Sequence, residues 1–242
     1  MTQLPRYLQL LWHREPRGRR GPRPGRSIEE IGAAAVAIAD TDGLDAVSMK
    51  SVAAAVGFTT MSLYRYVDSK DELGAVMLDV AYGPPDLRFG PDEGWRDRIT
   101  RWAREISARR FEHPWATEVR QVSPPLTPNL IRWTESGLEA LEGLPLTSQQ
   151  RLSALLAIDG WGQNHVRQTI QMGLTGPADP GTPQGAYLEL IGSLVDPDAF
   201  PRLTAAGSEV GDDDENFFDE EFAYGLGLLL DGIEALVRRS RA

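Results

Sequence analysis

The side chains in this sequence that suit binding chemistry most clearly are those of Thr60, Met61, Tyr64 and Arg65. At helical spacing they lie on faces other than the one that Leu63 occupies. A hydroxyl, a phenol and a guanidinium hydrogen-bond readily to base edges and phosphates, so this set favours DNA contact over an idle surface. The thioether of Met61 cannot donate a hydrogen bond and would read only the shape of a groove or a thymine methyl group.

Two short helices around a tight turn would position this face. Ser48 is a suitable N-cap for a helix that ends near Val56, and Gly57 suits the left-handed conformation that stops a helix. Thr59 or Thr60 can cap the second helix. Two helices joined by a short turn that contains glycine form a helix-turn-helix, which lays its second helix in the DNA major groove. A helical hairpin in an ordinary core has the same pattern, and it is the polar outer face that favours DNA binding.

Further helices are predicted on both sides of this pair. Ser27 and Glu30 form a capping box at the start of a helix that is expected to end before Asp42. Ser69 and Glu72 form a second capping box. Apolar residues follow each box at helical spacing, so residues 27–82 are predicted to form one small helical domain.

With these flanks, residues 27–82 resemble the DNA-binding domain of the tetracycline-repressor (TetR) family of transcription factors. The resemblance is carried by residues 34–53, by Val-Gly-Phe-Thr-Thr-Met-Ser-Leu-Tyr-Arg-Tyr-Val from residue 56, and by Ser-Lys-Asp-Glu-Leu from residue 69. Beyond residue 85 it is looser, although residues 94–98, 113–115 and 156–161 look like the C-terminal domain of the tetracycline-repressor branch. The resemblance implies an all-α fold, in which a helix-turn-helix domain precedes a larger helical domain that dimerises and encloses a ligand cavity.

The resemblance also implies which residues touch DNA. They are Lys50 in the first helix of the motif, Thr60, Met61, Ser62, Tyr64, Arg65 and Tyr66 in the recognition helix, and Lys70 at the start of the next helix. We expect Tyr64 and Lys70 to contact phosphates, and Thr60, Met61 and Arg65 to read bases.

Charge is distributed unevenly along the chain, whose formal net charge is −10. Residues 1–26 carry seven arginines against one acid, which gives +6, whereas residues 27–82 carry three cations against nine acids, which gives −6. Glycine and proline predict that residues 1–26 form a flexible arm, and its arginines, including Arg26, favour contact with a DNA backbone or minor groove. The alternative is a disordered, solubilising tail.

Composition excludes several classes of protein. The chain has no cysteine, which excludes disulfides and thiolate chemistry. It has no apolar run of about 18 residues and no signal-peptide pattern, so we expect a cytoplasmic protein without a membrane partner.

Residues 86–242 are predicted to form a helical domain after a joint at Pro84 and Pro85. Helices are expected over residues 95–112, 129–141, 147–174, 187–194 and 219–239, with loops at 175–185 and 207–216. The last helix carries a seam of Phe222, Leu226, Leu229, Ile233 and Leu236, and its Gly225, Gly227 and Gly232 are expected to permit close backbone approach. The resemblance implies that helices 148–174 and 217–239 of two subunits pair into a four-helix bundle, so that a homodimer reads a palindromic operator.

Polar and aromatic groups on these apolar helices are candidates for binding a small-molecule effector. They are Trp102, His113, Trp133, Asp159, Trp161, Gln163, Asn164, His165 and Arg167, of which Trp161, Asn164 and His165 are favoured. A lone tryptophan is more often part of a core, and Asp159 or Arg167 could equally form a dimer salt bridge. The family's metal-assisted site needs placed histidines, and only His13, His113 and His165 exist, so we expect no metal and no other cofactor.

The sequence thus predicts a DNA-binding regulator, most simply a repressor that a small molecule releases from its operator. An enzyme would need a nucleophile elbow, a phosphate loop or paired ligands, and none of these motifs is present beside His113 and Asp159. A helical scaffold that does not bind DNA remains an alternative, supported by the acidity of residues 27–82.

Overall fold

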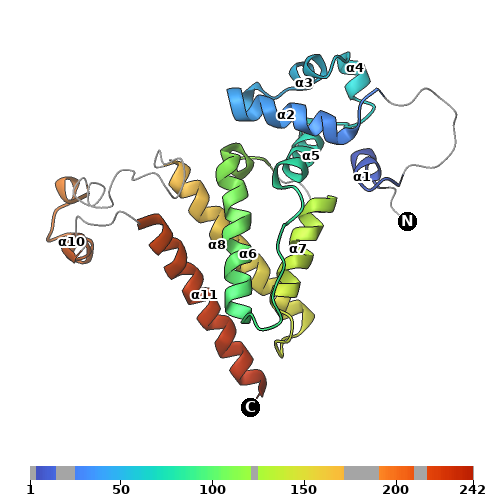
Figure 1. Ribbon diagram of the computed structural model, residues 1–242. Helices are drawn as coiled ribbons and strands as arrows, with labels where there is room; N and C mark the ends of the chain where they lie inside the picture. Colours follow the sequence, from blue (N-terminus) through green and yellow to red (C-terminus); the bar gives the residue numbers. More distant parts are fainter. Residues whose placement is uncertain (1–3, 15–24, 121–124, 172–190, 210–216, 242) are drawn as a thin grey trace. The chain divides into compact units, whose positions relative to one another are not determined.

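The computed structural model describes residues 4–14, 25–120, 125–171, 191–209 and 217–241, and these are helical without a strand. They divide into two compact units, residues 1–156 and 157–242, and the division falls inside one long helix. The elements of the first unit are α1 (Arg6–Leu11), α2 (Ile28–Asp42), η1 (Leu44–Ala46), α3 (Met49–Ala55), α4 (Thr60–Leu63), α5 (Lys70–Tyr82), α6 (Trp95–Glu112), η2 (Pro114–Thr117), α7 (Pro128–Ala140) and the first part of α8 (Ser148–Gln171). The second unit holds the rest of α8, α10 (Pro201–Glu209) and α11 (Phe217–Arg241) (Figure 1).

Local capping defines the helices of residues 27–82, which we call the reading head. The hydroxyl of Ser27 accepts from the amide of Glu30, whose carboxylate accepts from the Ser27 amide, so the predicted capping box is present. Ser48 caps α3 and Thr59 caps α4, as expected. Gly43 and Gly57 adopt φ angles of 84° and 75°, which residues with a side chain rarely adopt. Gly43 ends α2, and Gly57 lies in the turn after α3.

Two details of these helix ends differ from expectation. Helix α2 continues through Asp42 and stops at Gly43, rather than stopping before Asp42. At the start of α5, Ser69 accepts from the Glu72 amide, but the Glu72 carboxylate accepts from the amide of Asp68 and not from that of Ser69. The reciprocal half of the second capping box is therefore displaced by one residue.

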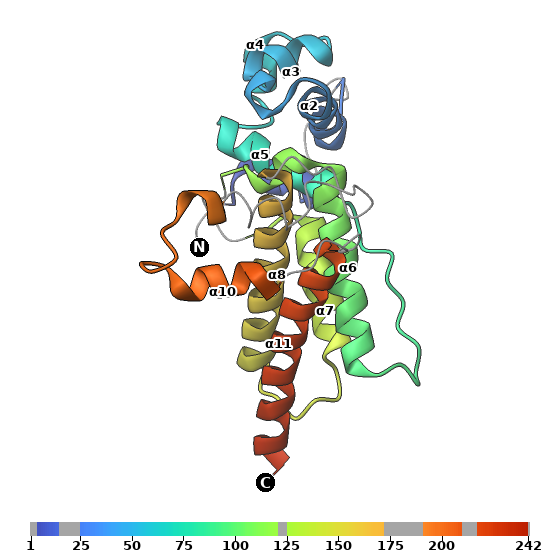
Figure 2. The same ribbon diagram turned by 90° about the vertical axis from the view of Figure 1, so that its left-hand side faces the viewer.

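Apolar side chains from α2, α3, α4 and α5 fill the core of the reading head. Fully buried members are Ile31, Ala35, Val52, Leu63, Val67, Leu73, Val76 and Met77. Gly32 lets α2 approach α5 closely, because a Cβ at this position would lie 2.7 Å from Val80 and 2.9 Å from Val76. Figure 2 shows α2, α3 and α4 gathered at one end of the first unit, with α5 leading from them toward α6 and α7.

The N-terminal segment differs from the flexible arm that glycine and proline predicted. Residues 6–11 form helix α1, which buries Tyr7, Leu8 and Leu11 and contacts α2. The indole Nε1 of Trp12 donates to the carbonyl of Leu126 at 2.8 Å. Residues 6–12 are therefore held against other parts of the first unit. The arginine-rich residues 15–24 lie outside the described residues.

Helices α6 and α7 occupy the predicted ranges and pack against each other through aromatic side chains. Trp102 donates to the carbonyl of Trp133 at 2.9 Å, and the two indoles meet edge to face. Gly137 makes room for this contact, since a Cβ there would lie 3.0 Å from Trp102 and 2.6 Å from Leu155.

In the second unit, α11 packs on α8 at Trp161. A Cβ at Gly225 would overlap the indole of Trp161, so the expected close approach is confirmed there. At Gly227 and Gly232 a Cβ would meet nothing within 4 Å inside the chain. The buried line of α11 is Phe222, Leu226, Leu230, Ile233 and Val237, whereas the predicted seam members Leu229 and Leu236 are half-buried.

The acidic loop expected at residues 207–216 is partly helical, because α10 extends through Glu209. Residues 210–216, the loop expected at 175–185 and most of the helix expected at 187–194 fall outside the described residues, although residues 191–194 are helical.

Candidate DNA-binding surface and effector-domain residues

Helix α4 presents the predicted polar face to solvent. Leu63 is fully buried and anchors the helix, while Met61 is 76% and Tyr64 43% exposed. Arg65 is also exposed, and Thr60 is half-buried. Ser62 is half-buried and shares a 2.9 Å hydrogen bond with the cap residue Thr59, so its hydroxyl already helps to hold the helix start.

Four of the predicted DNA-contacting residues are cations. Lys50 in α3, Arg65 after α4, Lys70 at the start of α5 and Arg26 before α2 are all exposed. Arg26 also pairs with Glu30 at 3.1 Å, an exposed contact worth little in stability. The structure therefore places these predicted DNA-contacting cations where a phosphate backbone can approach them.

Tyr66 lies differently from the other predicted DNA contacts. Its side chain is buried, its ring stacks on Phe58 at 5.8 Å between centroids, and its hydroxyl donates to the carbonyl of Arg26 at 3.1 Å. In the free protein Tyr66 positions the residue before α2 against the helix-turn-helix. Its predicted DNA contact stays a prediction.

The acids of the reading head are largely engaged within the fold. Of the nine acids in residues 27–82, a range that the structure describes in full, five hold backbone amides or side chains elsewhere, namely Glu30, Asp40, Asp71, Glu72 and Asp79. The bond from the Ser27 amide, with help from Arg26, lowers the pKa of the Glu30 carboxyl. These five acids therefore have structural roles within the fold, and the formal charge of residues 27–82 remains −6.

Asp79 is the most buried of these acids, and it joins the reading head to α7. Its carboxylate accepts from the amide of Asn129 at 2.7 Å and from the Asn129 side chain at 3.2 Å, in the first turn of α7. Burial raises the pKa of the Asp79 carboxyl, although the bond from the Asn129 amide acts in the opposite direction. A carboxyl at a helix N-terminus satisfies amides that have no partner within the helix.

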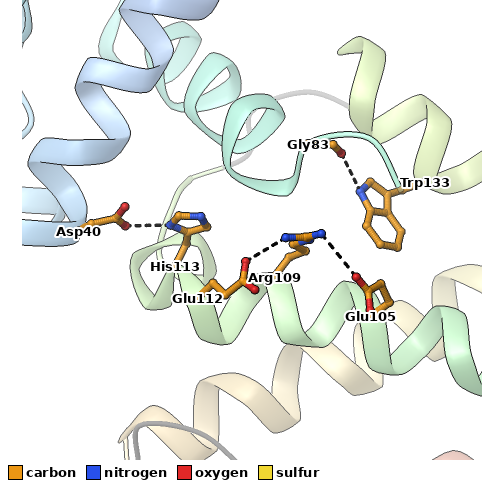
Figure 3. A network of polar contacts seen from close by, with 7 residues as sticks. All are labelled: Asp40, Gly83, Glu105, Arg109, Glu112, His113 and Trp133. Atoms are coloured by element: carbon orange, nitrogen blue, oxygen red, sulfur yellow. Dashed lines mark hydrogen bonds and ion pairs between the residues drawn. The ribbon is translucent and has the colours of Figure 1, made fainter. Parts of the chain in front are cut away.

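Three of the predicted effector residues have structural partners in the first unit. The indole nitrogens of Trp102 and Trp133 are occupied by the carbonyls of Trp133 and Gly83, at 2.9 Å and 3.0 Å. His113 lies beside Asp40 of α2 at 2.8 Å (Figure 3). These contacts give all three residues a role in packing or in joining elements, and their role in effector binding stays a prediction.

The predicted effector residues of α8 lie in the second unit. Trp161 donates to the carbonyl of Phe222 at 3.3 Å, and the buried ring of His165 lies 5.9 Å from Trp161 and 5.3 Å from Phe222. Asn164 accepts from the exposed Arg167 at 2.8 Å. The structure thus brings Trp161 and His165 together in an aromatic cluster. Asp159 and Gln163 are half-buried on the same helix.

Two other kinds of site, a metal centre and a membrane-spanning helix, were considered for the described residues. In the described part of the chain, no three histidine, aspartate or glutamate side chains gather in a way that could hold a metal ion. No helix there is long and apolar enough to cross a membrane.

Sequence reasoning missed the residues that link the reading head to the helices after it. Trp115 donates to Asp40 at 2.6 Å, and the buried guanidinium of Arg110 in α6 donates to the Tyr82 hydroxyl at 3.3 Å. Their partners lie 75 and 28 positions away along the chain, so no local pattern could reveal the pairs.

Comparison with protein families identifies both parts of the chain. Residues 31–75 match the family described as bacterial regulatory proteins, tetR family. Residues 90–237 match the family described as tetracyclin repressor-like, C-terminal domain.

Relatives and solved structures agree with these matches. The chain is 35% identical over 244 aligned positions to the HTH-type transcriptional repressor DrrR1 of Streptomyces coeruleorubidus, an alignment that covers 98% of this chain and 87% of the relative. The crystal structure of the Streptomyces coelicolor protein ActR in complex with actinorhodin has a TM-score of 0.72 at 20% identity, covering 88% of this chain and 98% of ActR. A possible TetR family regulator of Streptomyces coelicolor A3(2) has a TM-score of 0.65 at 24% identity, covering 87% of this chain and all of the other.

Proposed function

Because this chain belongs to the TetR family of bacterial regulatory proteins, we propose that it acts as a homodimeric repressor that leaves a palindromic operator when a small molecule binds its helical domain. The observation that carries the proposal is the exposed face of α4, which rests on a packed core in a domain whose cations Lys50, Arg65 and Lys70 are all exposed. The chain is a ligand-responsive, DNA-binding transcriptional repressor.

The roles on DNA follow from side-chain chemistry. Arg65 is the residue of this face that can donate two parallel hydrogen bonds to guanine, and Met61 offers a thymine methyl group an apolar contact. Tyr64, Lys50 and Lys70 suit phosphates, which fix the register of the protein on the duplex. Base preference therefore depends on Arg65 and Met61, and overall affinity depends on the cations around them.

A second copy of the chain is supported by apolar side chains that the two long helices leave in solvent. In the first unit, Leu156 of α8 is 75% exposed. In the second unit, Tyr224 and Leu228 of α11 are 67% and 58% exposed, and Gly227 has open space beside it. Tyr224 and Leu228 are four positions apart on α11 and so share one face of the helix, and contiguous apolar surface of this kind marks an interface more often than single exposed residues do. A twofold dimer also suits an operator with two half-sites.

The effector is proposed to be a small molecule that needs neither a metal nor another cofactor. ActR, which shares the fold, is recorded with actinorhodin. In this chain the cluster of Trp161, His165 and Phe222 offers ring faces and an imidazole, which suit a ligand with flat apolar and polar parts. We place the protein in the cytoplasm, where its operator is, and we propose that it works by binding and not by catalysis.

The test is fluorescence anisotropy of the full chain on a duplex from the DNA beside its own gene. We expect saturable binding that resists unrelated competitor DNA and weakens with salt, since phosphate contacts release counterions. Arg65→Ala should weaken binding to this duplex. Arg202→Ala, which removes the same charge from α10, should bind as the wild type does. Equal binding to unrelated DNA would contradict the proposal and favour the helical scaffold.

A further inference from the structure

One carboxylate joins the reading head to the helical domain that follows it. Oδ1 of Asp40, in the last turns of α2, accepts from Trp115 Nε1 at 2.6 Å and lies 2.8 Å from His113 Nδ1. His113 ends α6 and Trp115 belongs to η2, so both partners come from the domain after the Pro84 joint. Figure 3 shows Asp40 reaching from α2 to the imidazole at the end of α6.

The local fold presets both sides of this contact. Gly43 stops α2 shortly after Asp40, and Pro114 turns the chain from α6 into η2. Trp115 is buried, which fixes its indole, and its ring lies 5.7 Å from that of His113. Asp40 and His113 keep 35% and 18% of their side-chain surface exposed, so protons and salt reach the pair.

The charges around His113 are mainly negative. A cavity of about 480 Å³ beside the contact is lined by Trp115 and by the acidic residues Asp40, Asp42, Asp45, Glu112 and Glu118. Two arginines of α6 lie close to His113 along the chain. Arg109 is shared between Glu112 at 3.1 Å and Glu105 at 3.5 Å, and the buried Arg110 donates to the Tyr82 hydroxyl. A proton gained by His113 therefore adds a positive charge among carboxylates, next to the one it contacts.

We propose that Asp40 is a positioning residue, held by Trp115 and His113, that sets the reading head against the helical domain, and that protonation of His113 tightens this joint. Histidine is the side chain whose charge ordinarily changes between pH 5 and 8. A neutral imidazole gives Asp40 one ordinary hydrogen bond, whereas an imidazolium gives it a charge-assisted bond, which is stronger.

The Asp40 contact affects operator affinity by limiting how freely the reading head moves relative to the helices that follow it. A dimer binds two half-sites at a fixed spacing, so a loosely held head loses more conformational freedom on binding than a firmly held one. A tighter joint therefore raises operator affinity as the pH falls. Lower pH also strengthens DNA binding in general by reducing the negative charge of the protein, so only a comparison between variants isolates the joint.

The experiment measures operator affinity of the full chain by anisotropy at pH 6.0 and pH 8.0, and this part rests on the proposed function. His113→Gln keeps a donor for Asp40 but does not titrate. Asp40→Asn keeps the size and the acceptor but removes the charge. His13→Asn is the matched control, because His13 is exposed, adopts φ 50°, which asparagine tolerates, and lies far along the chain from the joint.

We expect every protein to bind its operator more tightly at pH 6.0 than at pH 8.0. This gain in affinity should be about threefold to tenfold larger in the wild type and in His13→Asn than in Asp40→Asn and His113→Gln, which is the range for a partly exposed charged bond. Equal pH profiles in His113→Gln and wild type would overturn the proposal.

A second readout does not depend on DNA. At pH 6.0, amide hydrogen exchange of residues 113–118 should be faster in Asp40→Asn than in the wild type, because the carboxylate no longer holds the corner. Unchanged exchange would overturn the joint even if the protein binds no DNA. Absent operator binding with faster exchange would overturn the proposed function and leave the joint standing.

Discussion

The reading head and helix α11 use apolar side chains in different ways. In the head, Leu63, Leu73 and Met77 are fully buried inside one chain, and the face that points outward is polar or flexible. In α11, Tyr224 and Leu228 remain in solvent while Leu226 and Ile233 are buried. The head is therefore complete in a single chain, whereas α11 has apolar surface left for a second copy. In the proposed homodimer, DNA reading belongs to the reading head and dimerisation to α11.

A charge on the exposed side of α11 tests most strongly whether this helix forms the dimer interface. We expect Leu228→Glu to dissociate the dimer and weaken operator binding about a hundredfold or more, since a charge in an apolar contact is costly to desolvate. Light scattering with size-exclusion chromatography reads the oligomer, and anisotropy reads the affinity. Ile131→Glu, on the partly exposed face of α7, is the control that should stay dimeric. A dimeric Leu228→Glu protein would move the interface elsewhere.

The next effect concerns the inner side of the same helix. Gly225→Ala should destabilise the fold by roughly 1–3 kcal/mol, because the added methyl group overlaps the Trp161 indole. Gly232→Ala is the control, since a Cβ at that position meets nothing within 4 Å and alanine favours a helix by about 1 kcal/mol. Urea unfolding at equal protein concentration measures both. Equal stability of the two variants would show that α11 does not lie against Trp161 in solution.

In the reading head the matching test is Arg65→Ala. It should relax the preference at one operator base pair by about 1–3 kcal/mol if the guanidinium bonds guanine. Arg65→Lys keeps the charge but not the bidentate fork, so it should lose the base preference and retain the salt dependence. Selection from a randomised operator library measures the preference, and an unaltered motif for Arg65→Ala would assign Arg65 to phosphate contact.

The smallest effect is a pH dependence from Asp79. Burial raises the pKa of this carboxyl in the folded state, so the folded protein holds the proton more tightly than the unfolded chain does. Stability from this group is therefore present at low pH and falls as the pH rises through the raised pKa. Between pH 4 and pH 6 the wild type should lose stability relative to Asp79→Asn, measured by urea unfolding. A difference that does not change with pH would contradict this account.

Signals within a few residues predicted much of the reading head. Ser48 and Gly57 marked the ends of α3, because capping and a positive φ angle depend on local chemistry. The face of Met61 and Tyr64 was also predicted, since helical spacing places it opposite Leu63.

Contacts between distant segments could not be predicted in the same way. Trp12, which follows α1, bonds the carbonyl of Leu126, 114 positions away along the chain. The composition of residues 1–26 is that of a flexible arm, so it could not predict this contact. The partnership of His113 with Asp40 likewise depends on tertiary structure, so the sequence alone presented His113 as an effector residue. Tyr66 was assigned to DNA by resemblance, but its burial follows from a ring contact with Phe58.

The central claim is that the α4 face reads a specific DNA sequence, and anisotropy on the duplex beside the gene tests it most directly. We expect saturable binding by the dimer, a steep loss of affinity with salt, and a clear preference over a duplex with a scrambled sequence. Binding to both duplexes with the same affinity, or to neither, would contradict it.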